Sequence, residues 1–196
     1  MATTTRVGGA PMTSVAPARW SASLLSGLIA GEIGAVVMAV VMAIAYAAIF
    51  QNALGFTYPL NVIGAIRYGD VALVSLTPVG YLWALAFHLG VAAIWGLVFA
   101  VAATVLRCDK DRWAPIILGL AIGLAAQIVD VNIIGPGLLA RLHGHDIWAE
   151  QVPPWVSWFS HVAFGLSFAA YGPIFRKLWL RFVGRDDLLA RDPRLT

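Results

Sequence analysis

The stretch Pro153-Pro154-Trp155-Val156-Ser157-Trp158-Phe159-Ser160-His161-Val162-Ala163-Phe164-Gly165 opens an apolar run that continues to Trp179. The run is longer than the ~20 residues that a helix needs to cross a ~30 Å hydrocarbon layer. Two prolines precede the run, a basic tail follows it, and His161 lies inside it. An ionisable side chain at membrane depth is a functional hypothesis by default. We therefore ask what His161 faces.

Composition places the whole chain in a membrane. The 196 residues are 60% hydrophobic and 12% charged, whereas a soluble domain averages about 25% charged residues. The net charge is +3, but the basic residues flank apolar runs, which favours a lipid bilayer as partner and excludes nucleic acid. The single Cys108 excludes an intrachain disulfide and a cysteine-rich metal site.

Four apolar runs are long enough to span a bilayer, and they cover about residues 22–50, 81–105, 113–134 and 155–179. Helices are the expected form, because every backbone polar group in lipid must be satisfied within its own segment. The sequence thus predicts an all-α, integral membrane four-helix bundle over residues 22–179. A polar N-terminal tail, 1–21, and a basic C-terminal tail, 180–196, flank it.

Charge distribution predicts the orientation of the chain. Of the 13 lysines and arginines, all but Arg67 and Arg141 fall in the N-terminal tail, in the turn 107–112, or from Arg176 to the C-terminus. Because positive residues accumulate on the cytoplasmic side, both termini should be cytoplasmic. The two longer loops, 51–79 and 135–154, should then face the outside.

Short motifs recur between the two halves of the chain. Gly27-Leu28-Ile29-Ala30-Gly31 resembles Gly119-Leu120-Ala121-Ile122-Gly123, and Gly96-Leu97-Val98-Phe99-Ala100 resembles Gly165-Leu166-Ser167-Phe168-Ala169. The pattern is typical of a two-helix tandem repeat related by an axis along the membrane normal. It is equally typical of plain helix packing through small residues.

Each predicted span carries one ionisable group: Glu32, His88, Asp130 and His161. His88 follows Tyr81 by seven residues and His161 follows Trp155 by six. At 1.5 Å per residue both histidines should lie ~10 Å below the outer boundary, with Asp130 at a similar level. Glu32 should lie nearer the cytoplasmic side, apart from the histidines.

Three chemical interpretations follow from these residues. His88 and His161, at matched depth on parallel helices, would suit axial ligation of a b-type haem, with Arg67 or Arg141 meeting its propionates. A transition-metal site at the outer face would use imidazole and carboxylate ligands. Ion or proton transport would use intramembrane polar groups. The candidate metal ligands are His143, His145, Asp146 and Glu150, and the transport candidates are Glu32, Gln127, Asp130 and Asn132.

The structural alternative is that these polar groups only hydrogen-bond to one another inside the bundle. No nucleophile–base–acid set, phosphate loop or paired catalytic carboxylates can be assembled from this sequence, so activity of the chain on its own is not expected. The leading functional interpretation is therefore a non-catalytic subunit of a larger membrane complex, of the energy-converting or oxidoreductase kind. Its partners would be other membrane protein subunits.

The spans also resemble a known group of proteins. The segment 27–34, the helix with His88 and Gly96, and the run Trp158–Gly165 after an outer loop are similar to the small four-helix inner-membrane proteins of bacteria typified by YagU. The resemblance covers the membrane spans alone. It implies a multi-pass fold in a bacterial cytoplasmic membrane and no activity, and the loop 143–145 lies outside it.

Overall fold

A computed structural model describes residues 15–51 and 53–184, and it contains helices but no strand over these residues. The expected tails, 1–21 and 180–196, lie mostly outside the described residues; residues 15–21 belong to the first helix, 180–182 to the last helix and 183–184 to a turn after it. The elements, in order, are α1 (Val15–Phe50), η2 (Ala53–Phe56), α2 (Tyr58–Tyr68), α3 (Val71–Val74), α4 (Pro78–Val105), η3 (Cys108–Lys110), α5 (Ala114–Ala126), η4 (Gln127–Ile134), α6 (Gly135–His143), α7 (Ile147–Gln151), α8 (Pro154–Leu166), η5 (Ser167–Ala170) and α9 (Tyr171–Phe182).

Over the described residues, three helices are long and apolar enough to cross a membrane: Ala16–Phe50, Pro78–Val105 and Ala114–His143. The predicted fourth span is helical but divided, because a 3-10 turn, η5, separates α8 from α9. The all-helical class is thus confirmed, and the count of four spans stays a prediction.

The third helix runs further than its sequence predicts. The expected loop begins at Gly135, yet the helix continues to His143 through the π-helix η4. In η4 the N–H of Gly135 donates to the carbonyl of Asp130, five residues earlier. Pro136 takes a position in the first turn of α6, where its missing N–H costs nothing. A wider turn therefore absorbs the glycine and proline that were expected to end the helix.

The predicted outer loops are also largely helical. Residues 53–74 form η2, α2 and α3, and α2 buries one face, which includes Val62 and Ile63. Residues 147–151 form α7, whose N-terminus is capped by the Asp146 carboxylate accepting from the N–H of Ala149 at 3.1 Å. Hydropathy alone did not indicate these helices, because they are short and bury only a few side chains.

Glycines bring α1 and α4 into close contact. A Cβ added to Gly27 would lie 2.5 Å from the carbonyl oxygen of Gly96, and one added to Gly96 would lie 2.5 Å from that of Gly27. Gly31 faces Gly96 from one turn further along. Only residues without a side chain permit this backbone approach. The helix pair is therefore fixed by these three positions.

The same device joins α5 to α8. Cβ atoms on Gly119 and Gly123 would collide with the carbonyl oxygens of Gly165 and His161, respectively. These glycines are the ones that the sequence paired with Gly27, Gly31 and Gly96. Both halves of the chain thus use matching motifs for matching contacts; a common ancestry of the halves stays a prediction.

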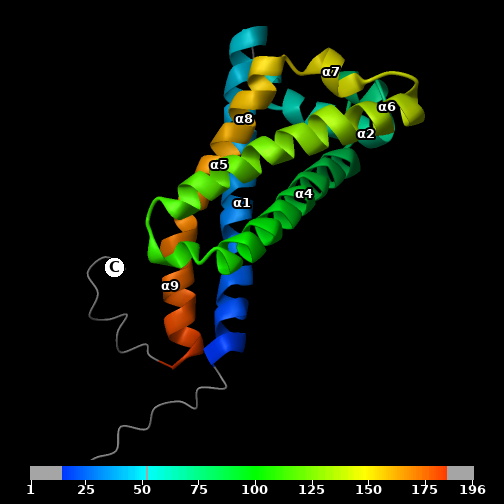
Figure 1. Ribbon diagram of the computed structural model, residues 1–196. Helices are drawn as coiled ribbons and strands as arrows, with labels where there is room; N and C mark the ends of the chain where they lie inside the picture. The colour runs from blue at the N-terminus through cyan, green and yellow to red at the C-terminus, as the bar shows by residue number, and fades with distance from the viewer. Residues whose placement is uncertain (1–14, 52, 185–196) are drawn as a thin grey trace, which may run out of the picture.

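The α1–α4 and α5–α8 pairs meet through α1, which also packs on α8 and α9. Figure 1 shows α1 beside α8 and α9, while α4 and α5 lean away together toward the end where α2, α6 and α7 gather. At the other end Arg19 of α1 pairs with Asp109 of η3 at 2.7 Å. At the same end the Ser23 hydroxyl of α1 hydrogen-bonds to the Tyr171 hydroxyl of α9 and accepts a hydrogen bond from the Thr104 hydroxyl of α4.

A candidate binding cavity beside the π-helix

A cavity of about 520 Å³ lies between α4 and the π-helical part of the third helix. It exists because α4 packs on α1 and α5 packs on α8, while α4 and α5 contact each other far less. Side chains of α2, α6 and α7 complete the lining at the end of the helices where these short elements gather. Its walls are mainly aliphatic and aromatic side chains, including Met38, Ile63, Phe87, Leu139 and Phe164.

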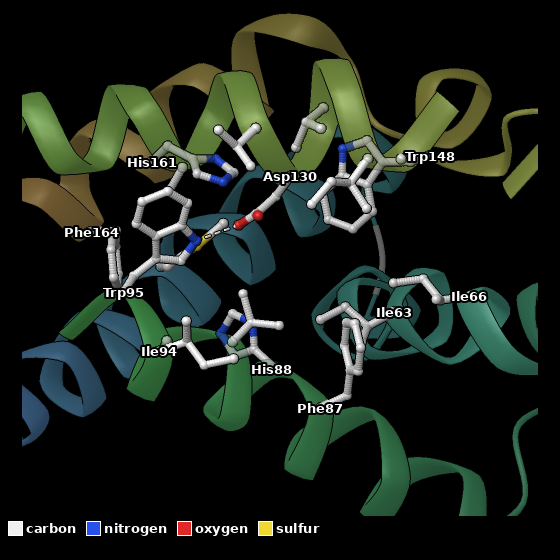
Figure 2. A pocket seen from close by; sticks show the side chains of 18 of the residues that line it. Ile63, Ile66, Phe87, His88, Ile94, Trp95, Asp130, Trp148, His161 and Phe164 are labelled. Carbon is white, nitrogen blue, oxygen red and sulfur yellow. Dashed lines mark hydrogen bonds between the residues drawn. The ribbon is translucent and has the colours of Figure 1, made fainter. Parts of the chain in front are cut away.

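Four polar side chains from three elements enter this apolar space. Figure 2 shows His88 and Trp95 rising from α4, Asp130 coming from η4 and His161 from α8. The structure thus brings together His88, Asp130 and His161, which the sequence placed at one depth. The indole Nε1 of Trp95 donates to Oδ2 of Asp130 at 2.7 Å, and this hydrogen bond spans the gap between the two helices.

Backbone carbonyls fix the tautomer of each histidine. Nε2 of His88 lies 3.0 Å from the carbonyl oxygen of Ala35, and Nδ1 of His161 lies 2.8 Å from that of Ser157. Because a carbonyl only accepts, each of these nitrogens carries the proton. The neutral rings then leave a lone pair on Nδ1 of His88 and on Nε2 of His161. Neither nitrogen has a hydrogen-bond partner within the described part of the chain.

The remaining candidate residues of the spans do not line the cavity. Gln127 is buried, accepts from Ser157 Oγ at 2.7 Å and donates to Asn132 Oδ1 at 3.2 Å. These bonds tie η4 to α8 and hold the π-turn that carries Asp130. Glu32 is partly exposed on α1 and is not among the residues around the cavity.

Haem ligation by the two histidines stays a prediction. Bis-histidine ligation uses one nitrogen of each ring, and the nitrogens left for it are Nδ1 of His88 and Nε2 of His161, because the other nitrogen of each ring is engaged by a backbone carbonyl. Arg67, expected near a propionate, instead stacks over Tyr68 and Trp83, with its Cζ 5.4 and 5.7 Å from the ring centroids.

The predicted outer metal ligands point to separate partners. His143 Nε2 lies 3.1 Å from the carbonyl oxygen of Ile66, and Asp146 caps α7. His145 lies between two carboxylates, 3.0 Å from Glu150 and 3.2 Å from Asp70. Over residues 15–51 and 53–184, no group of three or more His, Cys, Asp or Glu is arranged to hold a metal ion. The metal interpretation is therefore not supported.

His145 instead joins the two outer segments. Its hydrogen bond to Glu150, reinforced by the charge of Asp70, raises the pKa of the imidazole above its ordinary value. His143 and His145 thereby attach the α6–α7 connection to α2 and to the turn before α3. Since Ile63 and Ile66 of α2 and Trp148 of α7 line the cavity, this attachment holds its outer end together.

Sequence reasoning missed two tryptophans at the cavity. Trp95 orients Asp130, and Trp148 has a buried indole N–H with no hydrogen-bond partner among the described residues. Trp95 lies in the middle of an apolar run and Trp148 in a predicted loop, and neither position by itself indicates a binding site. The i+7 spacing of His88 and Trp95, which places both on one helix face, is the signal that was available.

No protein-family model matches the chain, and searches of curated proteins and of solved structures found no match either. The predicted resemblance to YagU-like proteins therefore stays a prediction.

Proposed function

We propose that this protein is an integral membrane protein that binds a lipophilic small molecule in the cavity beside η4. It would act as a non-catalytic, ligand-binding subunit of a larger assembly in a bacterial cytoplasmic membrane, with both termini inside. The observation that carries the proposal is the cavity itself. Its volume of about 520 Å³ is within the range of small-molecule sites, which combine apolar walls with a few convergent polar groups.

The rim of the cavity reaches the outer surface of the helices. Four of its lining residues are also substantially exposed: Phe87 (38%), Ile94 (62%), Ile134 (50%) and Leu138 (42%). All four are apolar, as expected for a surface in contact with lipid tails. A ligand dissolved in the bilayer could thus enter sideways between α4 and the third helix without crossing water.

The apolar exterior supports the membrane setting. Large side chains remain exposed along α1 and α4, among them Val36 (59%), Ile44 (59%) and Val98 (43%). Such continuous exposed apolar surface is uncommon on soluble monomers and marks contact with lipid or with other proteins.

A matched pair of variants tests ligand binding. Ile134 lines the cavity, and its neighbour Ile133 is also exposed but does not line it. Fluorescence of neutral 1-aminoanthracene, added to the protein in lipid nanodiscs, reports occupancy of an apolar site. We expect Ile134→Trp to fill the rim and weaken binding at least about tenfold, whereas Ile133→Trp should leave it unchanged. Absence of saturable binding to the unmodified protein, or equal binding by both variants, would refute the proposal.

The subunit role has its own test. Extraction of native membranes in a mild detergent should yield the protein in a complex larger than the single chain, with stoichiometric partner chains. A stable isolated monomer from native membranes would contradict the subunit role and leave ligand binding untouched.

A further inference from the structure

The polar groups of the cavity present acceptors and a carboxylate but no positive charge. Among the residues around it there is neither lysine nor arginine, and its titratable groups are His88, Asp130 and His161. Asp130 has one hydrogen bond, from Trp95, and no ion pair within residues 15–51 and 53–184. An ionised carboxylate away from water needs a partner of opposite charge, and the described protein residues supply none.

The two histidines reinforce this electrostatic character. Because their protons are committed to the carbonyls of Ala35 and Ser157, the neutral rings offer the cavity only lone pairs. With the second oxygen of Asp130 in its ionised form, they make three acceptor positions contributed by α4, η4 and α8. A ligand that itself only accepts, such as a simple ketone, would leave the two ring nitrogens unsatisfied, at a cost.

The apolar walls add a second, independent preference. Phe87, Trp95, Trp148 and Phe164 all line the cavity, and Figure 2 shows their rings around the polar groups. Aromatic faces attract cations, most strongly where water is excluded. A carboxylate, lone pairs and aromatic rings together favour a positive charge carried on an apolar body.

We propose that the ligand is a lipophilic monovalent cation, such as a protonated amine or a quaternary onium ion, whose charge is held by Asp130. This inference rests on the proposed function, since it names the ligand class of the same cavity. The apolar body of the ligand would lie toward the exposed rim at Ile94 and Ile134, and its charge would lie at the hydrogen-bonded Trp95–Asp130 pair.

Cation binding at this site competes with protons. In the empty cavity a proton on Asp130 removes the unpaired charge; when the cation enters, that proton leaves, so one positive charge replaces another. His88 on α4 and His161 on α8 are the other titratable groups facing Asp130 among the described lining residues. Protonation of either histidine would repel the cation. Protonation of any of the three groups therefore weakens cation binding. Affinity for the cation should fall as the pH is lowered.

Competition against 1-aminoanthracene in nanodiscs tests the ligand class. The competitors are methyltriphenylphosphonium, a permanent cation, and triphenylphosphine oxide, a neutral molecule with the same three rings. We expect the cation to displace the probe at least about tenfold more effectively, because charge attraction is strong in a site of low dielectric. Asp130→Asn, which keeps the size of the side chain, should remove this preference for the cation.

Glu32→Gln is the matched control, because it removes a carboxylate from α1 outside the cavity and should leave the preference for the cation intact. Lowering the pH from 8 to 5 should weaken binding of the cation to the unmodified protein by up to about tenfold per pH unit. The effect should be smaller in Asp130→Asn. Equal displacement by both competitors, or an unchanged cation preference in Asp130→Asn, would overturn this inference while binding of 1-aminoanthracene still supports a lipophile site. Failure of 1-aminoanthracene to bind would refute the proposed function itself.

Discussion

At the scale of single residues, hydrogen bonds to backbone carbonyls decide what each histidine can do. His161 is 5% exposed, and its bond to the carbonyl one turn earlier holds the ring toward the cavity. His88 is held by a carbonyl of another helix, α1, and so depends on tertiary packing. The residue type therefore indicated a polar site at this depth. The free nitrogen on each ring, which sets the kind of ligand, depends on these partners.

His145 is the residue whose protonation should be visible in the folded protein. Its carboxylate neighbours Glu150 and Asp70 raise the pKa of the imidazole, so the attachment of the two outer segments is fully present below the ordinary pKa of histidine, ~6.5. It is lost as the pH rises through the raised value. We expect amide hydrogen exchange over residues 144–151 to be faster at pH 8.5 than at pH 6, after correction for the intrinsic rates. His145→Gln should abolish this difference in exchange rate. An equal difference in that variant would rule out His145 as its cause.

At the scale of elements, close helix contacts and one π-turn create the cavity. Glycines fix α1 against α4 and α5 against α8, whereas α4 and α5 make few contacts with each other. The wider turn of η4 then places Asp130 opposite Trp95. π-turns are rare in helices and occur often at functional sites. The site thus results from how helix pairs are spaced.

Two glycines of α4 allow a controlled test of this spacing. A Cβ at Gly96 would meet the backbone of α1, whereas a Cβ at Gly90 meets nothing within 4 Å. We expect Gly96→Leu to push α1 from α4 and destabilise the protein by at least about 1–3 kcal/mol. Gly90→Leu should be neutral or stabilise it by up to about 1 kcal/mol. Thermal unfolding in detergent, followed by circular dichroism, measures both; equal melting temperatures would show that the glycine contact does not hold the helices.

At the scale of the whole molecule, polar contacts join the helices at two opposite ends. Arg19 and Asp109 join the start of α1 to the turn between α4 and α5, and α9 packs on that turn. Asp70, His145 and Glu150 join the outer segments at the opposite end of α4. The orientation predicted from the basic residues places the end with Arg19 and Asp109 on the cytoplasmic side.

Single cysteines test the orientation. Cys108 is 5% exposed, and burial together with the charges of Asp109 and Asp111 raises the pKa of its thiol, so it should react slowly; Cys108→Ser removes it altogether. In that background Ala149→Cys should be labelled by a membrane-impermeant maleimide in intact spheroplasts. Asp111→Cys should be labelled only after the membrane is opened. The reverse pattern would invert the orientation.

The sequence by itself determined the helical class, because long runs of apolar residues can satisfy their backbone only as helices. It also placed His88, Asp130 and His161 at one depth, because helix rise converts residue number into distance. Only the tertiary structure decided that the third helix continues through Gly135, that the fourth is divided, and that the outer histidines bind carbonyls and carboxylates. These outcomes depend on contacts between residues far apart in the chain, which neither hydropathy nor spacing records. The unpaired carboxylate of Asp130 belongs with them, since only packing shows that no cation among the described residues reaches it.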